Sequence, residues 1–301
     1  MIDLAVLPVA GRGTRLLPLT KSQPKEMLPI GRRPVVQCVA EELVCCGVGR
    51  MLFITGPGKA AIENHFDYDD ELVANLRETG KEELLKELEF ERENVEYFYT
   101  RQRRQLGLGH AVLCAEPFVK RQDFVVALGD SVIGVQGKSR IVKQMIDIFE
   151  EEKAAAVIAF QEIPREEVFR YGVAQPDVAT GQEPGDLFRL KDMVEKPSVE
   201  EAPSNLAVSA RYVFSPAIFD RLHETKPGKG GEIQLTDAVR DLIRDGEKVL
   251  GVRLPAGERR YDVGNFESYF EAFLEFAVSD PLYGDAAKEI IERLHQRRND
   301  K

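Results

Sequence analysis

Residues 8–29 read PVAGRGTRLLPLTKSQPKEMLP and follow a short apolar segment from Ile2 to Leu7. The stretch carries two glycines, two arginines and two lysines, but only one acidic residue, Glu26. An apolar segment that ends in a glycine turn is typical of a buried strand whose following backbone N–H groups can approach an anion. The stretch therefore predicts an anion-binding turn beside a sheet, in a chain whose formal net charge is −10.

Two common phosphate-binding loops do not fit this turn. A dinucleotide-binding loop would need a third small residue at position 16, where Leu16 stands, and a Walker loop would need Gly-Lys-Ser/Thr. What remains is a glycine turn followed by basic residues, a pattern that solvated surface charges would also give. Pro18, Pro24 and Pro29 favour a binding role, because they stiffen the loop that carries the charges.

The rest of the chain predicts an α/β fold with a Rossmann-like, mostly parallel central sheet flanked by helices. No segment is composed like a flexible linker, so we expect a single domain over residues 1–301. Strands are expected at Leu4–Leu7, Met51–Thr55, Val95–Tyr99, Phe124–Leu128, Ala155–Phe160, Tyr171–Gln175, Leu187–Val194, Leu206–Phe214 and Val249–Leu254. Helices are expected at Pro34–Cys46, Lys59–His65, Asp70–Leu88 with a break near Gly80, Ala111–Ala115, Ile141–Glu151, Pro216–His223, Glu232–Arg244, Phe266–Val278 and Ala286–Gln296.

Composition excludes several classes of protein. No run of about 18 apolar residues exists, so we expect no membrane span, and the negative net charge argues against a nucleic-acid partner. The first residues lack a basic region and a small-residue cleavage site, so we expect no secretory signal. The four cysteines show no metal spacing, and we expect reduced core thiols in a cytoplasmic protein.

Residues 11–37, GRGTRLLPLTKSQPKEMLPIGRRPVVQ, resemble the signature of the sugar-1-phosphate nucleotidyltransferases. The PKEML version is similar to that of the bacterial UTP–glucose-1-phosphate uridylyltransferase family. Further segments follow in family order over nearly the whole chain: 54–67 ITGPGKAAIENHFD, 101–115 RQRRQLGLGHAVLCA, 128–130 LGD, 171–173 YGV, 194–197 VEKP, 202–214 APSNLAVSARYVF, 230–239 GGEIQLTDAV and 261–265 YDVGN.

This resemblance implies a reaction and residues that carry it. Such an enzyme transfers a uridylyl group from UTP to glucose 1-phosphate by direct in-line displacement, giving UDP-glucose and pyrophosphate. Both substrates are polyanions, and Arg and Lys are suited to holding their phosphates. The resemblance implies that Arg15 contacts the triphosphate and that Lys25 contacts the reacting phosphates. It further implies nucleotide binding by Ala10, Gly11, Gly13, Thr14, Gln102 and Gly107; for the base-reading amide, Gln105 is the alternative, but its spacing to GLGHA does not match the family.

The resemblance also implies a metal pair and a sugar-phosphate site. Asp130 and Asp262 would bind Mg²⁺, a hard ion that takes few protein ligands. Gly129 and Val263, beside them, depart from the family pattern, in which Pro and Cys often stand. Sugar-phosphate binding falls to Gly172, Glu195 and Lys196, in a small sugar-binding extension of the nucleotide-diphospho-sugar transferase fold.

The same resemblance divides the domain and leaves alternatives. Residues 1–140 would form a nucleotide-binding half, 141–265 a sugar-phosphate-binding half and 266–301 C-terminal helices, in a homodimer or homotetramer. One alternative is the same fold acting with dTTP or another nucleotide. The other is an inactive relative with a regulatory role. The presence of all four expected catalytic and metal-binding residues argues against it: Arg15, Lys25, Asp130 and Asp262.

Overall fold

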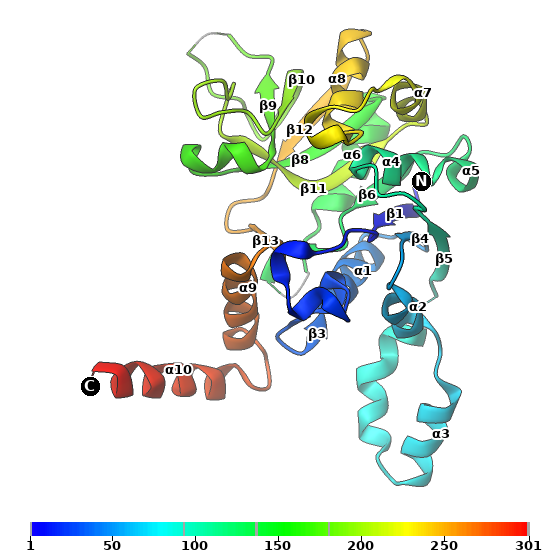
Figure 1. The fold of residues 1–301 in the computed structure, drawn as a ribbon, viewed down its shortest axis with the longest axis vertical. Coiled ribbons are helices and arrows are strands. Elements are labelled where there is room, and N and C mark those ends of the chain that lie inside the picture. Colours follow the sequence, from blue (N-terminus) through cyan, green and yellow to red (C-terminus); the bar gives the residue numbers. More distant parts are fainter. Residues whose placement is uncertain (1, 93, 136–137, 180, 300–301) are drawn as a thin grey trace.

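The computed structural model describes residues 2–92, 94–135, 138–179 and 181–299. A nine-stranded sheet forms its centre, with the order β5-β4-β1-β6-β11-β8-β12-β10-β9 (Figure 1). The strands are β1 (Leu4–Pro8), β4 (Arg50–Thr55), β5 (Glu96–Arg101), β6 (Phe124–Ala127), β8 (Ala156–Glu162), β9 (Gly172–Pro176), β10 (Leu187–Glu195), β11 (Leu206–Phe214) and β12 (Val249–Arg253).

The strand directions confirm the expected mostly parallel sheet. β4, β5 and β6 join β1 through parallel pairings, and β8 pairs parallel with β12. β11 lies antiparallel between β6 and β8, and β10 lies antiparallel between β12 and β9. All strands of this sheet except β10 and β11 therefore run in one direction, and the antiparallel neighbours lie in the half built by the later sequence.

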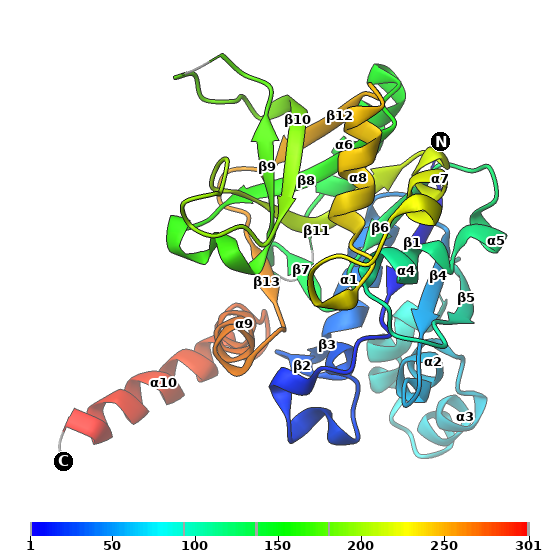
Figure 2. The same cartoon turned by 45° about the horizontal axis from the view of Figure 1, so that its top comes forward.

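Helices cover both faces of the sheet, as near-continuous apolar strands require. Alternate residues of β1 face opposite sides: Ala5 and Leu7 join one core cluster, and Leu4 and Val6 join the other. The first cluster is covered by α1 (Val35–Cys45), α2 (Ala60–Phe66), α6 (Ile141–Glu152) and α9 (Phe266–Val278). The second is covered by α4 (Leu108–Leu113), α5 (Glu116–Val119), α7 (Ala217–Glu224) and α8 (Leu235–Arg244) (Figure 2).

Some boundaries differ from expectation for local reasons. The charged region after residue 70 forms α3 (Asp70–Glu78) and a 3-10 segment, η4 (Glu82–Arg92), separated by Gly80 at φ 69°. The helix expected from Glu232 begins only at Leu235. Ile233 instead donates its N–H to the Leu106 carbonyl at 2.7 Å and accepts from the Gly109 N–H at 2.9 Å. These bonds hold the chain extended before the helix.

Two short antiparallel pairs lie outside the expected strands. β2 (Pro29–Ile30) pairs antiparallel with β3 (Arg33–Pro34), and β7 (Ser131–Ile133) pairs antiparallel with β13 (Arg260–Asp262). These strands have two or three residues and no apolar alternation, so the sequence pattern did not reveal them. The second pair joins segments far apart in sequence.

The prediction for the cysteines is right for two of the four. All four are free thiols; Cys38 and Cys46 are buried, but Cys45 is exposed and Cys114 is half-buried. Cys45 is the last residue of α1 and lies on the side of the helix away from its buried face. The segment is mostly apolar, so its sequence did not indicate that Cys45 would be exposed.

A buried ion pair ties α1 to the centre of the sheet. Arg211, on β11, and Glu42, on α1, are both 0% exposed. The guanidinium donates to the two Glu42 oxygens at 3.0 and 2.6 Å, and also to the Ser131 carbonyl at 2.9 Å. Arg211 thereby fixes the start of β7 as well as the helix.

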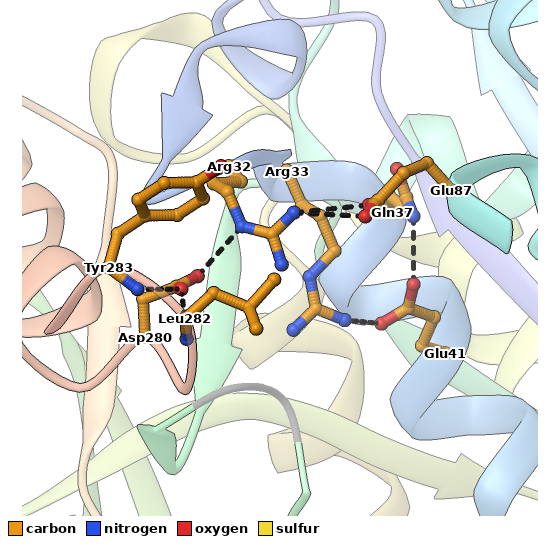
Figure 3. A network of polar contacts seen from close by, with 8 residues as sticks. All are labelled: Arg32, Arg33, Gln37, Glu41, Glu87, Asp280, Leu282 and Tyr283. Atoms are coloured by element: carbon orange, nitrogen blue, oxygen red, sulfur yellow. Dashed lines mark hydrogen bonds and ion pairs between the residues drawn. The ribbon is translucent and has the colours of Figure 1, made fainter. Parts of the chain in front are cut away.

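The C-terminal helix α10 (Gly284–Asn299) extends away from the body of the molecule (Figures 1 and 2). Its base is held by Arg32, which donates to Asp280 at 2.9 Å and to Glu87 at 3.2 Å (Figure 3). Asp280 in turn accepts the backbone N–H groups of Leu282 and Tyr283 at 2.9 Å. Three segments far apart in sequence therefore meet where α10 leaves the domain.

Among the described residues, no helix combines the length and the apolar character needed to cross a membrane.

Candidate active site

A cavity of about 700 Å³ lies at the carboxyl ends of β1 and β6. This is the edge at which open α/β sheets bind ligands. Of the residues expected to bind nucleotide, all but Gly13 line this cavity: Ala10, Gly11, Thr14, Arg15, Gln102 and Gly107. Lys25 and Asp130 line it as well.

Gly13 shapes the turn without lining the cavity. It has φ 65°, a conformation that favours glycine, and it precedes the 3-10 turn Thr14–Leu16. A Cβ there would lie 3.0 Å from Cγ2 of Thr20, and Thr20 Oγ1 donates to the Gly13 carbonyl at 2.7 Å. The glycine turn is thus folded tightly against the loop that follows it.

The short β7–β13 pair brings the two expected metal ligands together. Asp130 immediately precedes β7, and Asp262, at the end of β13, lies opposite Ser131. The Val263 N–H donates to the Asp130 carbonyl at 3.0 Å, and Ser131 Oγ donates to Asp262 at 3.3 Å. Lys25 forms an ion pair with Asp130.

Charges at this centre act strongly on one another because the groups are close together and only partly exposed, with 17% of the Lys25 side chain and 16% of the Asp130 side chain accessible. Burial would lower the pKa of Lys25, but the charges of Asp130, Glu26 and Asp262 raise it above its ordinary value. Burial would raise the pKa of Asp130, but Lys25 holds it below its ordinary value. Burial raises the pKa of Asp262; Arg260 opposes that rise, and Asp130 adds to it. The fold therefore stabilises the ionised form of Asp130 and disfavours the ionised form of Asp262.

Arg15 reaches the same centre from the glycine turn. A Cβ on Gly264 would lie 2.6 Å from an oxygen of Asp262 and 3.4 Å from Nη2 of Arg15. The guanidinium therefore lies over the turn that follows Asp262, and a side chain at Gly264 would displace both groups.

Behind the centre, Glu26 and Lys59 form a second buried ion pair at 2.6 Å, with 1% and 5% of their side chains exposed. Glu26 directly follows Lys25 in the chain. Burial raises the pKa of Glu26, and the charges of Lys59 and Lys25 offset part of that rise. This pair anchors the loop that carries Lys25 to the start of α2.

Two side-chain amides, of Gln102 and Gln105, line the same cavity. Gln102 is buried and donates to the Gly107 carbonyl at 3.0 Å. Gln105 donates to the Ala10 carbonyl at 2.8 Å and accepts from Arg12 at 2.6 Å. The two glutamines share the cavity, so Gln105, which sequence spacing set aside, supports the glycine turn and gives Arg12 a partner.

A smaller cavity of about 140 Å³ brings together the residues expected to bind sugar phosphate. Glu195 accepts from Thr236 Oγ1 at 2.6 Å and pairs with Lys196 at 2.9 Å. A Cβ on Gly172 would lie 3.0 Å from Thr236 Oγ1 and 3.2 Å from Glu195, so only glycine leaves this space open. Leu108 and Leu128 line both cavities, which therefore adjoin.

The donor set at Asp130 and Asp262 suits a hard divalent cation. Within the part of the chain that the structure describes, no group of three or more His, Cys, Asp or Glu side chains could hold a metal ion. A pair of carboxylates that leaves the other positions to phosphate oxygens and water is the usual arrangement for Mg²⁺. The residues present thus fit such an ion.

Comparison with known proteins agrees with this geometry. The family model described as "Nucleotidyl transferase" matches residues 4–278. The chain belongs to the nucleotidyl transferase family. This nucleotidyl transferase is 42% identical to the UTP–glucose-1-phosphate uridylyltransferase of Bacillus subtilis (strain 168), over 96% of this chain and 96% of the relative. The resemblance expected from the sequence is therefore confirmed.

Solved structures are similar over the same extent. The UTP-bound UGPase from Acinetobacter baumannii is 38% identical, with a TM-score of 0.87 over 98% of this nucleotidyl transferase and 100% of that chain. A UDP-glucose pyrophosphorylase complexed with UDP-glucose is also 38% identical, with a TM-score of 0.80 over 91% of this chain and 97% of the other. These matches confirm the expected nucleotide-sugar transferase fold.

Proposed function

We propose that this protein transfers a uridylyl group from UTP to glucose 1-phosphate, giving UDP-glucose and pyrophosphate. The observation that carries the proposal is the contact between two cavities, one beside the glycine turn and one beside Glu195 and Lys196, with Lys25 and Asp130 at the centre. The names of the relatives support the same substrates, since they include UTP-bound and UDP-glucose-bound proteins.

The residues would act mainly by holding two anions in line. Backbone groups of Ala10 and Gly11 and the amide of Gln102 bind the uracil, while Gly13 and Thr14 shape the turn. Arg15 and Lys25 hold the triphosphate and neutralise charge as the sugar phosphate attacks the α-phosphorus. No covalent enzyme intermediate is needed, because the phosphate oxygen of the sugar is itself the nucleophile.

Mg²⁺ is the proposed cofactor, bound by Asp130 and Asp262. When bound, it would neutralise charge on the phosphates during transfer. Lys25, which pairs with Asp130 in this structure, remains close enough to that carboxylate to help orient it.

The sugar phosphate binds in the smaller cavity. The backbone at Gly172 and the carboxylate of Glu195 contact sugar hydroxyls, and Lys196 meets the phosphate. Thr236 holds Glu195 in place through its hydroxyl.

Substitution of Lys196 is expected to weaken the binding of only one of the two substrates. Lys196→Ala should raise the KM for glucose 1-phosphate about 10-fold or more, because one charge-assisted contact is lost. Initial rates with each substrate varied in turn would measure it. A change confined to the KM for UTP would contradict this role.

Nucleotide choice tests the proposed function itself. Purified protein would be assayed for pyrophosphate release with UTP, dTTP, ATP, CTP and GTP, each with glucose 1-phosphate and with other sugar 1-phosphates. We expect UTP to exceed dTTP by about 10-fold or more in kcat/KM, since one methyl group distinguishes the bases. A clear preference for dTTP would replace the proposed substrate by the first alternative.

The whole chain is proposed to be one nucleotidyltransferase domain in a cytoplasmic protein. Residues 1–140 would bind nucleotide, 141–265 would bind sugar phosphate, and 266–301 would form the C-terminal helices. The partners are thus UTP, glucose 1-phosphate and their products, with no nucleic acid and no membrane.

Assembly as a homodimer or homotetramer is proposed to involve α10. This projecting helix exposes Ile290, Ile291 and Leu294, at 46%, 39% and 56%, on one stripe. Ile291→Glu with Leu294→Glu is expected to shift the mass measured by light scattering toward that of one 33.8 kDa chain. Glu289→Gln, on the polar side of the helix, is the matched control. Unaltered protein that is already monomeric would contradict the proposal.

A further inference from the structure

Arg260 stands between the metal pair and the sugar cavity. It begins β13 two residues before Asp262, so the two side chains share one face of the strand. Arg260 lines the cavity of about 140 Å³ that holds Glu195 and Lys196. It also lines a neighbouring cavity of about 380 Å³ that reaches Asp262.

The guanidinium is held in place by neutral groups. Nη1 donates to the Val208 carbonyl at 2.7 Å, and the group lies 4.4 Å from the centre of the Tyr171 ring. Its Nε is buried and has no hydrogen-bond partner among the described residues. Arg260 is therefore oriented by contacts that do not neutralise its positive charge.

Two of the carboxylates near Arg260 pair with lysines, whereas Asp262, on the same strand, has no ion pair among the described residues. Glu195 pairs with Lys196, and Asp130 pairs with Lys25. Among the described residues, no carboxylate forms an ion pair with Arg260. The charge still reaches the centre: it adds to the effect of Lys25 that lowers the pKa of Asp130, and it opposes the rise that burial causes in the pKa of Asp262.

We infer that Arg260 binds the phosphate group of the sugar 1-phosphate, together with Lys196. Lys196 alone offers a point charge that Glu195 already shares, whereas a guanidinium can donate two parallel hydrogen bonds to a phosphate. Arg260 lines the sugar cavity and does not line the cavity beside the glycine turn, so it serves this substrate and not UTP. The inference rests on the proposed function.

A neighbouring arginine supplies the matched control. Arg259 immediately precedes β13 and pairs with Glu271 at 2.8 Å and Glu275 at 3.0 Å, on α9. Arg259→Gln also removes one positive charge, at the position next to Arg260, but from a guanidinium that already has carboxylate partners.

The experiment compares Arg260→Gln with Arg259→Gln in the full chain. We expect Arg260→Gln to raise the KM for glucose 1-phosphate, and in the reverse direction the KM for UDP-glucose, by about 10- to 100-fold. The KM values for UTP and pyrophosphate should stay within about twofold. Arg259→Gln should leave all four unchanged. A role limited to packing against Tyr171 would instead alter stability or affect both substrates alike.

Two results would overturn the inference: an unchanged KM for glucose 1-phosphate in Arg260→Gln, or a change only in the KM for UTP. If Arg260→Gln does not fold, Arg260→Lys decides, because it keeps the charge and loses the fork. Its KM for glucose 1-phosphate should rise about threefold or more, and no rise would overturn the inference.

Failure of the proposed function would be seen separately, as unaltered protein that does not turn over UTP with glucose 1-phosphate. Calorimetric titration with glucose 1-phosphate then decides the present inference. Weaker binding to Arg260→Gln than to Arg259→Gln would support it, and equal binding would overturn it.

Discussion

Asp130→Ala and Asp262→Ala are each expected to lower kcat by about three orders of magnitude, because each removes one of two carboxylates proposed to hold the metal ion. Steady-state rates of pyrophosphate release at saturating UTP and glucose 1-phosphate would measure the loss. Asp147→Ala is the control, since Asp147 is an exposed carboxylate that pairs with Lys143 on α6. A rate near that of unaltered protein in either variant would remove that residue from the metal site.

The two substitutions should differ in their effect on stability. The pKa of Asp130 is lowered in the folded state, so its charge stabilises the fold above its unfolded pKa. The pKa of Asp262 is higher in the folded state than in the unfolded state. The free energy of unfolding therefore falls as the pH rises from the unfolded to the folded pKa of Asp262, and the ionised Asp262 destabilises the fold at neutral pH. Asp130→Ala should therefore lower the Tm at pH 7, whereas Asp262→Ala should keep or raise it. Thermal unfolding followed by circular dichroism distinguishes these results.

Arg211→Met is expected to give the largest loss of stability, about 3–5 kcal/mol in the free energy of unfolding. It would leave the Glu42 carboxylate buried without its partner; burial already raises the pKa of Glu42, and Arg211 offsets only part of that rise. Urea denaturation at pH 7 would measure the change. Arg221→Met, which breaks the surface pairs with Glu224 and Asp245, should cost no more than about 1 kcal/mol.

A double variant separates the charge effect from the loss of packing. Arg211→Met with Glu42→Leu replaces both buried charges by apolar groups, so it should recover most of the stability that Arg211→Met loses. A single variant within about 1 kcal/mol of the unaltered protein would contradict the buried-pair account. So would a double variant that is less stable than the single one.

The glycine turn and Asp130 could be predicted from sequence because their signals are local. Apolar residues before Pro8 and before Gly129 mark strands, and residues at the carboxyl ends of neighbouring parallel strands meet at one edge of the sheet. The turn chemistry of Gly11 and Gly13 can likewise be read from consecutive residues. These features needed no knowledge of distant contacts.

The features that sequence reasoning missed depend on distant partners. Arg211 interrupts an apolar strand, and its partner Glu42 lies 169 residues away, so neither residue alone signals the pair. Asp262 could be placed only through the family resemblance, because β13 has three residues and no apolar alternation. Arg260 gave no signal before its strand was known. The bonds of Ile233 to Leu106 and Gly109, which delay the start of α8, belong to the same class.

Formation of UDP-glucose by the purified full chain tests the central claim most directly. UTP and glucose 1-phosphate would be supplied with Mg²⁺ or with a chelator, and UDP-glucose and pyrophosphate would both be quantified. The account predicts equal amounts of the two products with Mg²⁺ and almost none with the chelator. Protein that binds UDP-glucose but forms no product with Mg²⁺ would contradict the account, and would instead indicate an inactive relative with a regulatory role.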